Sequence, residues 1–170
     1  DLTATQVRYR DYQPALEKAT TFATEWLGNV PVVFGEFGSY FNFGGITRSR
    51  QEEYIATSHV LNNYYEAFER MFQSRMLWCW SPENDYRLGD RWNHEDFSIV
   101  DPDGKPRSEL AWSRPHARAL AGKPIATHFH SDFHYFDPDK GTPNAQREFL
   151  VRYASKETSA PSEIGRASCR

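Results

Sequence analysis

The chain has 170 residues, which corresponds to one domain or to one domain and part of a second. Its 20 basic and 23 acidic side chains leave a net charge of −3, which excludes a nucleic-acid-binding protein that relies on bulk positive charge. Aromatic residues make up 15% of the chain, too many for a disordered tail, and no apolar run approaches the ~20 residues of a membrane-spanning helix. Two cysteines, Cys79 and Cys169, cannot build a disulfide scaffold or a Cys-rich zinc site.

The first half of the chain predicts a helix followed by a strand–helix–strand unit. Pro14 suits the first turn of a helix, which carries apolar residues at helical spacing and stops at Gly28. The short apolar run 30–34 predicts a strand that is buried on both faces, as in a parallel sheet. A capping box that begins at Ser49 predicts the next helix, and residues 76–80 predict a second apolar strand. The long loop after the first strand therefore lies at the carboxyl end of the sheet, where α/β proteins place their active sites.

The second half changes from helical to extended spacing. After a polar loop we predict a short helix with Ser113 as its cap, Pro115 in its first turn and Gly122 as its stop. From Lys123 the apolar period is 2 rather than 3.6, and the alternation resumes near Arg147 after a turn region. This pattern predicts an antiparallel hairpin and a domain boundary between Gly122 and Lys123.

The last residues of the chain, 163–170, resemble the translation of a sequencing adapter more than natural sequence. An ordinary polar tail is the alternative. We therefore leave this segment out of the predicted fold and expect Cys169 to be foreign to the natural protein. Asp1 opens the chain without an initiator Met, so the sequence gives no indication of the compartment.

Glu36 lies at the end of the first predicted strand, within Gly35-Glu36-Phe37-Gly38. A carboxylate at this end faces the mouth of a barrel, because unpaired burial elsewhere would cost several kcal/mol. The two glycines would let a ligand approach closely. The motif alone fits a catalytic carboxylate and a carboxylate that caps a helix or pairs with an Arg equally well.

Trp78 and Trp80 project from one face of the second predicted strand, and Leu77 and Cys79 project from the other. An indole at the mouth of a strand can stack on a sugar ring. A Trp in an apolar strand is more often part of the core, and without further context we favour the core position.

His128, His130, Asp132 and His134 alternate on one face of the predicted hairpin. Three imidazoles and a carboxylate are suitable ligands for Zn²⁺ or Cu²⁺. However, alternate strand residues are ~6.6 Å apart and project in parallel, so a tetrahedral site would need ligands from elsewhere. We interpret this face as the solvated side of an edge strand and predict no metal site.

Three motifs in a fixed order resemble one enzyme family. The GEFG strand is followed by LWCWSPEN at 77–84 and by GDRWNHEDFSI at 89–99. This set is similar to glycoside hydrolase family 5, and within it to the endoglycoceramidase and fungal glucosylceramidase branch. The likeness extends over most of residues 14–162. Leu88 and His94 depart from the branch, which usually has Trp and Gly at these positions.

The resemblance implies an α/β fold: the C-terminal part of a (β/α)8 TIM barrel (strands 7 and 8, residues 1–122), followed by the first strands of an all-β sandwich (123–162), with 163–170 as a non-native tail. It also implies a retaining β-glycosidase without a cofactor or metal, acting on a carbohydrate or glycolipid substrate, with Glu36 as the catalytic nucleophile. The substrate-binding residues that the resemblance implies are Trp78, Trp80, Asn84, Asp90, Trp92, Asn93, Glu95 and Asp96.

The general acid/base of this family is a Glu that follows Asn at the end of the fourth barrel strand, and the chain contains no Asn-Glu-Pro-like segment. Retaining glycosidases need both carboxylates. We therefore expect the 170-residue chain alone to be neither stably folded nor active. A carbohydrate-binding pseudo-enzyme is the alternative function, and the residue at the fourth-strand position would separate the two.

Overall fold

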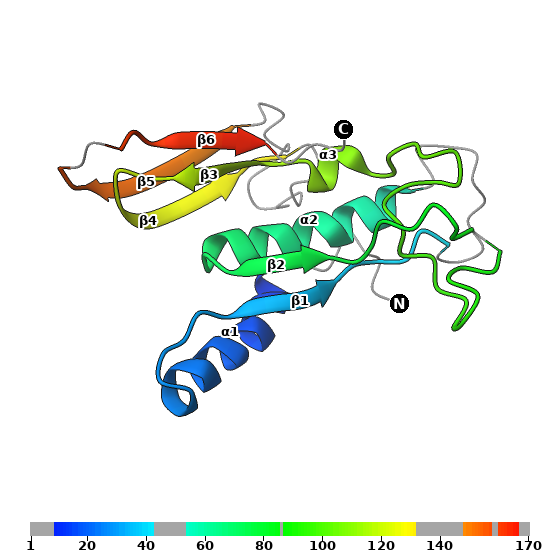
Figure 1. Cartoon of the computed structure of the whole chain (residues 1–170), viewed down its shortest axis with the longest axis horizontal. Coiled ribbons are helices and arrows are strands. Elements are labelled where there is room, and N and C mark those ends of the chain that lie inside the picture. Colours follow the sequence, from blue (N-terminus) through cyan, green and yellow to red (C-terminus); the bar gives the residue numbers. More distant parts are fainter. Residues whose placement is uncertain (1–8, 43–53, 86, 132–147, 158–159, 167–170) are drawn as a thin grey trace, which may run out of the picture.

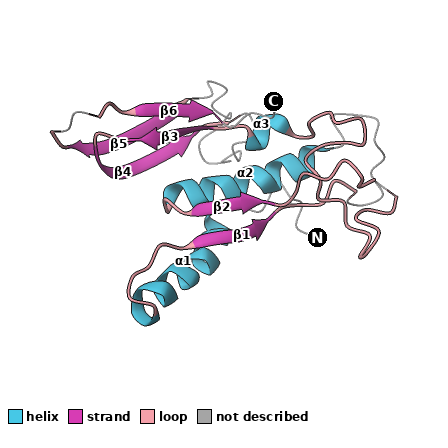
Figure 2. Cartoon of the chain, viewed as in Figure 1, coloured by secondary structure: helices cyan, strands magenta, loops and turns pink. Residues whose placement is uncertain are grey.

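The computed structural model describes residues 9–42, 54–85, 87–131, 148–157 and 160–166. These residues form a mixed α/β structure (Figures 1 and 2). In chain order the elements are α1 (Tyr9–Trp26), β1 (Val33–Phe37), α2 (Ile55–Arg70), β2 (Ser74–Leu77), α3 (Glu109–Trp112), β3 (Pro115–Ala119), β4 (Gly122–Phe129), β5 (Phe149–Ser155) and β6 (Glu163–Arg166). Within the described ranges, no helix is both long and apolar enough to cross a membrane.

The predicted βαβ unit is confirmed, because β1 and β2 pair in parallel and α2 connects them. The pairing contains an irregularity: Phe34 lies opposite Arg75, whereas Phe37 lies opposite Leu77, so β1 has one extra residue between these pairs. Such a bulge changes the direction in which the following side chains point. Both phenylalanines contact aromatic side chains of α2, while Glu36 between them is exposed.

The two strands differ from the predicted ranges and from the predicted burial. β1 begins at Val33 rather than Val30, and β2 ends at Leu77 rather than Trp80. Burial on both faces is wrong for the part of the chain that the structure describes: Val33 is 52% exposed and Met76 is 60% exposed. These side chains project from the face of the sheet that α2 does not cover.

The end of α1 is confirmed by its cap. Gly28 and Asn29 have φ values of 75° and 59°, and the Asn29 amide donates to the Ala23 carbonyl at 3.1 Å. Pro14 lies inside α1 rather than in its first turn, because the helix begins earlier than predicted. The capping box expected before α2 (residues 49–52) lies outside the described residues.

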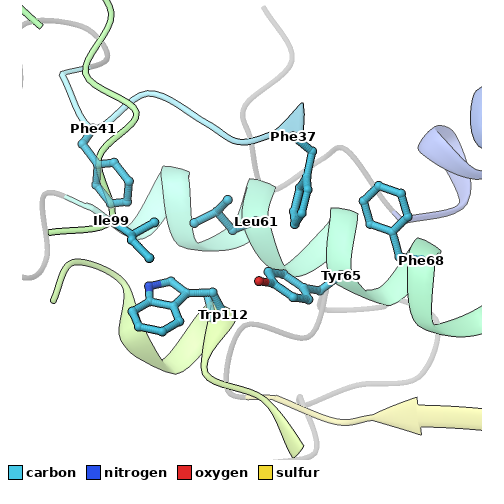
Figure 3. Close-up of a cluster of buried hydrophobic side chains, with 8 residues drawn as sticks. Phe37, Phe41, Leu61, Tyr65, Phe68, Ile99 and Trp112 are labelled. Carbon is cyan, nitrogen blue, oxygen red and sulfur yellow. The ribbon is translucent and has the colours of Figure 1, made fainter. Parts of the chain in front are cut away.

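The core collects around α2 and is rich in aromatic side chains (Figure 3). Its buried members are Phe37, Phe41, Leu61, Tyr65, Phe68, Ile99, Ala111 and Trp112. The Phe37 ring contacts the rings of Tyr65 and Phe68 with centroid distances of 5.3 and 5.0 Å. Phe72, which the helical spacing assigned to the same stripe, is 45% exposed because the helix ends before it.

The strands that follow α3 form a second layer, with α2 between them and the β1–β2 pair (Figure 1). β4 and β5 pair antiparallel, which confirms the predicted hairpin. The helix predicted across Pro115 is wrong: α3 ends at Trp112, and residues 115–119 form β3. A proline disfavours helical geometry at the residue before it, here Arg114, and is tolerated as the first residue of a strand.

Residues 163–166 form β6, which pairs antiparallel with β3. That residues 163–170 are a non-native tail stays a prediction. The boundary predicted between Gly122 and Lys123 stays a prediction.

Candidate functional site

The candidate site lies where the chain leaves the carboxyl ends of β1 and β2. The Trp78 amide donates to the Phe37 carbonyl at 2.8 Å, which extends the contact between the two strands past β2. Gly38 permits this approach, because a Cβ at its position would lie 2.5 Å from the Trp78 carbonyl oxygen and 2.8 Å from the Phe97 ring. Glu36 near the end of β1 and Trp78 directly after β2 thus lie at the same end of the sheet.

The two indoles of this segment are not part of the core. Trp78 is 50% exposed and Trp80 is 52% exposed, whereas Cys79 between them is buried. The predicted alternation is confirmed, but the core position that the apolar pattern favoured is wrong. The peptide bond between Trp78 and Cys79 is cis.

Cys79 lies among several of the acidic residues that the sequence singled out. Burial raises the pKa of its thiol, a hydrogen bond with Ser81 lowers it, and the negative charges of Asp96, Glu36 and Asp90 raise it further. Three carboxylates from two separate motifs are therefore close enough to Cys79 to act on one thiol. The fold brings these motifs together at the end of the sheet.

The loop after β2 is shaped by the Asp90 carboxylate. Its Oδ1 accepts from the amides of Trp92 and Asn93 at 2.9 and 2.8 Å. Gly89 has a φ of 56°, and a Cβ there would lie 2.4 Å from the Glu95 nitrogen, so this turn requires glycine. Desolvation acts to raise the pKa of Asp90, but the surrounding backbone amides outweigh it and hold the pKa below its ordinary value. The tip of the loop is thus fixed by its own backbone and leaves Trp92 85% exposed.

Glu95 connects this loop to the segment that follows β1. Its Oε1 accepts from the Tyr40 hydroxyl at 2.7 Å, and its Oε2 accepts from the side-chain amide of Asn93. The hydrogen bond to Glu95 is the main reason why the pKa of Tyr40 is raised. Next to this contact, Asn42 Nδ2 donates to the His94 carbonyl at 2.8 Å.

Asp96 points inward rather than into the cleft that the resemblance implied. Its side chain is completely buried, and its Oδ2 lies 2.6 Å from Nη1 of Arg107, which is itself 2% exposed. Its Oδ1 accepts from the Ser98 amide at 3.2 Å. Asn84 is also buried, at 7% exposure. Arg107 could not be identified from the sequence, because a single Arg in a polar stretch carries no periodic signal.

The His-rich face is described only in part. His128 Nε2 lies 3.3 Å from His130 Nδ1, whereas Asp132 and His134 lie outside the described residues. Among the residues that the structure does describe, no three His, Cys, Asp or Glu side chains form a group that could hold a metal ion. The interpretation of this face as solvated surface stays a prediction.

No protein-family model matches the chain. Three curated proteins that are similar to parts of it carry the names of glucosidases. Ergosteryl-beta-glucosidase of Saccharomyces cerevisiae is 38% identical over 77 residues, which are 45% of this chain and 10% of that protein. Glucosylceramidase of Rhizopus delemar is 25% identical over 172 aligned residues, 84% of this chain and 25% of that protein. Glucosylceramidase of Cryptococcus neoformans var. grubii is 32% identical over 72 residues, 42% of this chain and 10% of that protein.

A solved structure of Cryptococcus neoformans sterylglucosidase 1 shares the fold of the chain. Its TM-score is 0.63 at 21% identity, over 71% of this chain and 21% of that chain. A second structure of the same protein, with tris, gives a TM-score of 0.61. The chain is therefore a relative of glycoside hydrolases and has a mixed α/β fold found in part of one. It spans between 10% and 25% of the length of the relatives named here.

Proposed function

We propose that the full-length protein is a retaining β-glycosidase of family 5 that hydrolyses a glucoside with an apolar aglycone, and that Glu36 is its nucleophile. The observation that supports this most directly is that Glu36, near the carboxyl end of β1, is exposed, and that the exposed Trp78 follows directly after β2 at the same end of the sheet. The bulge in β1 directs Phe34 and Phe37 toward α2 and leaves Glu36 accessible. Accessibility is required of a carboxylate that attacks an anomeric carbon.

The retaining mechanism assigns separate roles to two carboxylates ~5–5.5 Å apart. One attacks the anomeric carbon and forms a glycosyl-enzyme ester as the aglycone leaves. The other protonates the departing oxygen and then removes a proton from the water that cleaves the ester. In our proposal Glu36 has the first role, and the second belongs to a Glu outside these 170 residues. The chain would supply strands 7 and 8 of the (β/α)8 barrel and the first strands of a sandwich.

The exposed aromatic side chains favour a substrate with an apolar part. Trp78, Trp80 and Trp92 are each at least half exposed, and an indole presents a broad apolar face to a sugar ring or to an apolar aglycone. Exposed apolar side chains that cluster near one edge are typical of a binding surface. The names of the relatives, which refer to glucosides of ergosterol, ceramide and sterols, support the same substrate class.

The direct test is hydrolysis of an activated aryl β-glucoside by the full-length protein and by its Glu36→Gln variant. We expect the substitution to lower turnover by several orders of magnitude, because it removes covalent catalysis. Glu25→Gln, at an exposed position on α1, is the matched control and should retain full turnover. Turnover of Glu36→Gln near the unsubstituted level would contradict the assignment of the nucleophile. An unsubstituted protein that binds glucosides without hydrolysing them would favour the pseudo-enzyme alternative.

A further inference from the structure

Asp96 connects several segments of the candidate site. Its carbonyl accepts from the Phe41 amide at 2.6 Å, and its amide donates to the side-chain oxygen of Asn42 at 3.1 Å. Its carboxylate accepts from the Ser98 amide and pairs with Arg107. One residue thus joins the segment after β1, the loop after β2 and the segment before α3.

The residues that follow Asp96 extend this connection to the segment that carries the indoles. The Ser98 hydroxyl accepts from the Ser81 amide at 3.0 Å. The Ile99 amide donates to the Cys79 carbonyl at 2.9 Å, and the Ile99 carbonyl accepts from the Arg107 amide at 2.7 Å. The residues on both sides of Trp80 are therefore hydrogen-bonded to Ser98 and Ile99, in the segment that follows Glu95.

The Arg107 side chain is enclosed. Its guanidinium lies over the rings of Phe41 and Tyr54, at 5.3 and 5.9 Å from their centroids. Its Nε and Nη2 are buried and have no hydrogen-bond partner among the described residues. Exposed ion pairs contribute little, but removal of one partner of a buried pair leaves an uncompensated charge. The pair therefore favours one position of Asp96 strongly over others.

We propose that Arg107 is a positioning residue for substrate binding: through Asp96 it holds Glu95 and Trp80 in place relative to Glu36, without touching the substrate itself. The inference rests on the proposed function, because it concerns the same site. If the ion pair is lost, the loop after β2 is free to move relative to β1. The reacting carboxylate stays on its strand, so the defect falls on binding more than on the chemical step.

The experiment compares Arg107→Lys and Arg107→Met in the full-length protein, at a temperature where circular dichroism shows the variants to be folded. For Arg107→Met we expect the KM for an aryl β-glucoside to rise about tenfold or more, with a smaller change in kcat. Arg107→Lys should show a smaller rise in KM, because it keeps the charge but not the planar guanidinium. A merely structural role would lower the active fraction and hence kcat, while KM would stay constant. If Arg107→Met does not fold, Arg107→Lys carries the comparison.

Arg114→Lys is the matched control. Arg114 is as buried as Arg107 and pairs with Glu69, but toward the opposite end of α2. This variant should lower the melting temperature and leave KM unchanged. An equal rise of KM in Arg114→Lys, or an unchanged KM in both Arg107 variants, would show that the inference is wrong.

A second measurement does not depend on activity. Arg91 is exposed near the tip of the loop, and its rate of cleavage by trypsin reports local opening. We expect cleavage after Arg91 to be faster in the Arg107 variants than in the unsubstituted protein and in Arg114→Lys. An unsubstituted protein without glucosidase activity would contradict the proposed function, and the cleavage rate would then decide whether Arg107 holds the loop. If the unsubstituted protein is active, the change in KM decides whether Arg107 is a positioning residue.

Discussion

Two buried ion pairs, one toward each end of α2, differ in what they hold together. Near the N-terminal end, Arg107 pairs with Asp96 beneath loops whose aromatic side chains are exposed. Toward the C-terminal end, Arg114 binds both carboxylate oxygens of Glu69, at 2.7 and 2.9 Å, and its remaining nitrogen donates to Asn62 Oδ1 at 2.6 Å. The first pair supports a surface that a ligand can reach, and the second joins two layers of the fold.

The contacts of Arg114 explain how the Arg114–Glu69 pair links two layers of the fold. Arg114 also donates to the Phe129 carbonyl of β4 at 3.3 Å, which ties the second layer to α2. Arg75 lies 3.6 Å from Glu69, and its guanidinium covers the Tyr65 ring at 4.6 Å. Burial raises the pKa of Tyr65 to about 12, so its hydroxyl stays protonated over the physiological range. Toward the C-terminal end of α2 the charged groups pair with one another inside the protein, whereas at the candidate site the Glu36 carboxylate and the indoles of Trp78 and Trp80 are exposed.

Glu69→Gln should give the largest effect on stability and little effect on binding. The substitution leaves the buried guanidinium of Arg114 without a carboxylate, so we expect the free energy of unfolding to fall by about 3–5 kcal/mol. The measurement is chemical denaturation of the full-length protein, together with KM for an aryl β-glucoside, which should not change. Arg118→Gln is the control: the Arg118–Glu163 pair is of similar length, at 2.6 Å against 2.7 Å, but its partners are 61% and 53% exposed. It should cost at most about 1 kcal/mol. An equal fall in the free energy of unfolding for the two variants would mean that the buried Arg114–Glu69 pair stabilises the fold no more than an exposed pair.

Gly38→Ala should affect the site end instead. The added methyl group would meet the Trp78 carbonyl oxygen at 2.5 Å, so the backbone that carries the indole must shift. Displacement of a binding group by about 1 Å can lower kcat/KM by about 100-fold, and we expect a loss toward that size. Gly35→Ala offers a comparison on the same strand, because a Cβ at Gly35 meets no atom within 4 Å. It should change kcat/KM by less than a factor of about three. Similar losses for both variants would mean that the close approach at Gly38 does not matter.

The order of the elements could be predicted from local signals. Apolar spacing and turn residues identified the βαβ unit, the end of α1 and the β4–β5 hairpin. The bulge in β1 could not be predicted in this way, because it results from Phe34 and Phe37 both packing against α2. The error at Pro115 has a similar origin: proline suits the first turn of a helix and the start of a strand, and tertiary contacts decide between them.

The sequence indicated which segments meet at the candidate site but not the orientation of each side chain, and the roles of the site residues stay predictions. The motifs identified Glu36, Trp78 and Glu95, and the fold brings their segments together at one end of the sheet. The inward orientation of Asp96 depends on the path of the loop, which returns Arg107 to a position beneath it. Sequence spacing does not encode that path, since no regular element connects the two residues.

The smallest expected effect concerns the start of the same loop and depends on pH. Asp85 Oδ1 accepts from the amides of Leu88 and Arg87, at 2.6 and 2.8 Å. The Leu88 amide contributes most to holding the pKa of Asp85 below its ordinary value; desolvation opposes this, and the Arg87 amide adds to it. Because the folded state has the lower pKa, the charge stabilises the fold above the unfolded value of about 3.9, and this contribution is lost as pH falls through the folded-state pKa.

Asp85→Asn isolates this contribution, because the amide oxygen keeps a neutral acceptor for the same two hydrogen bonds. The unsubstituted protein should be the more stable of the two above about pH 4, by a margin that stays constant toward neutral pH and shrinks as the pH falls. The measurement is the free energy of unfolding of both proteins between about pH 2 and 7, a range that includes the ordinary Asp pKa. Since Asp85 lies in a surface loop, the margin should be well below the loss caused by Glu69→Gln. A margin that grows on acidification would mean that the carboxylate is disfavoured in the folded loop, the opposite of the effect expected from its hydrogen bonds.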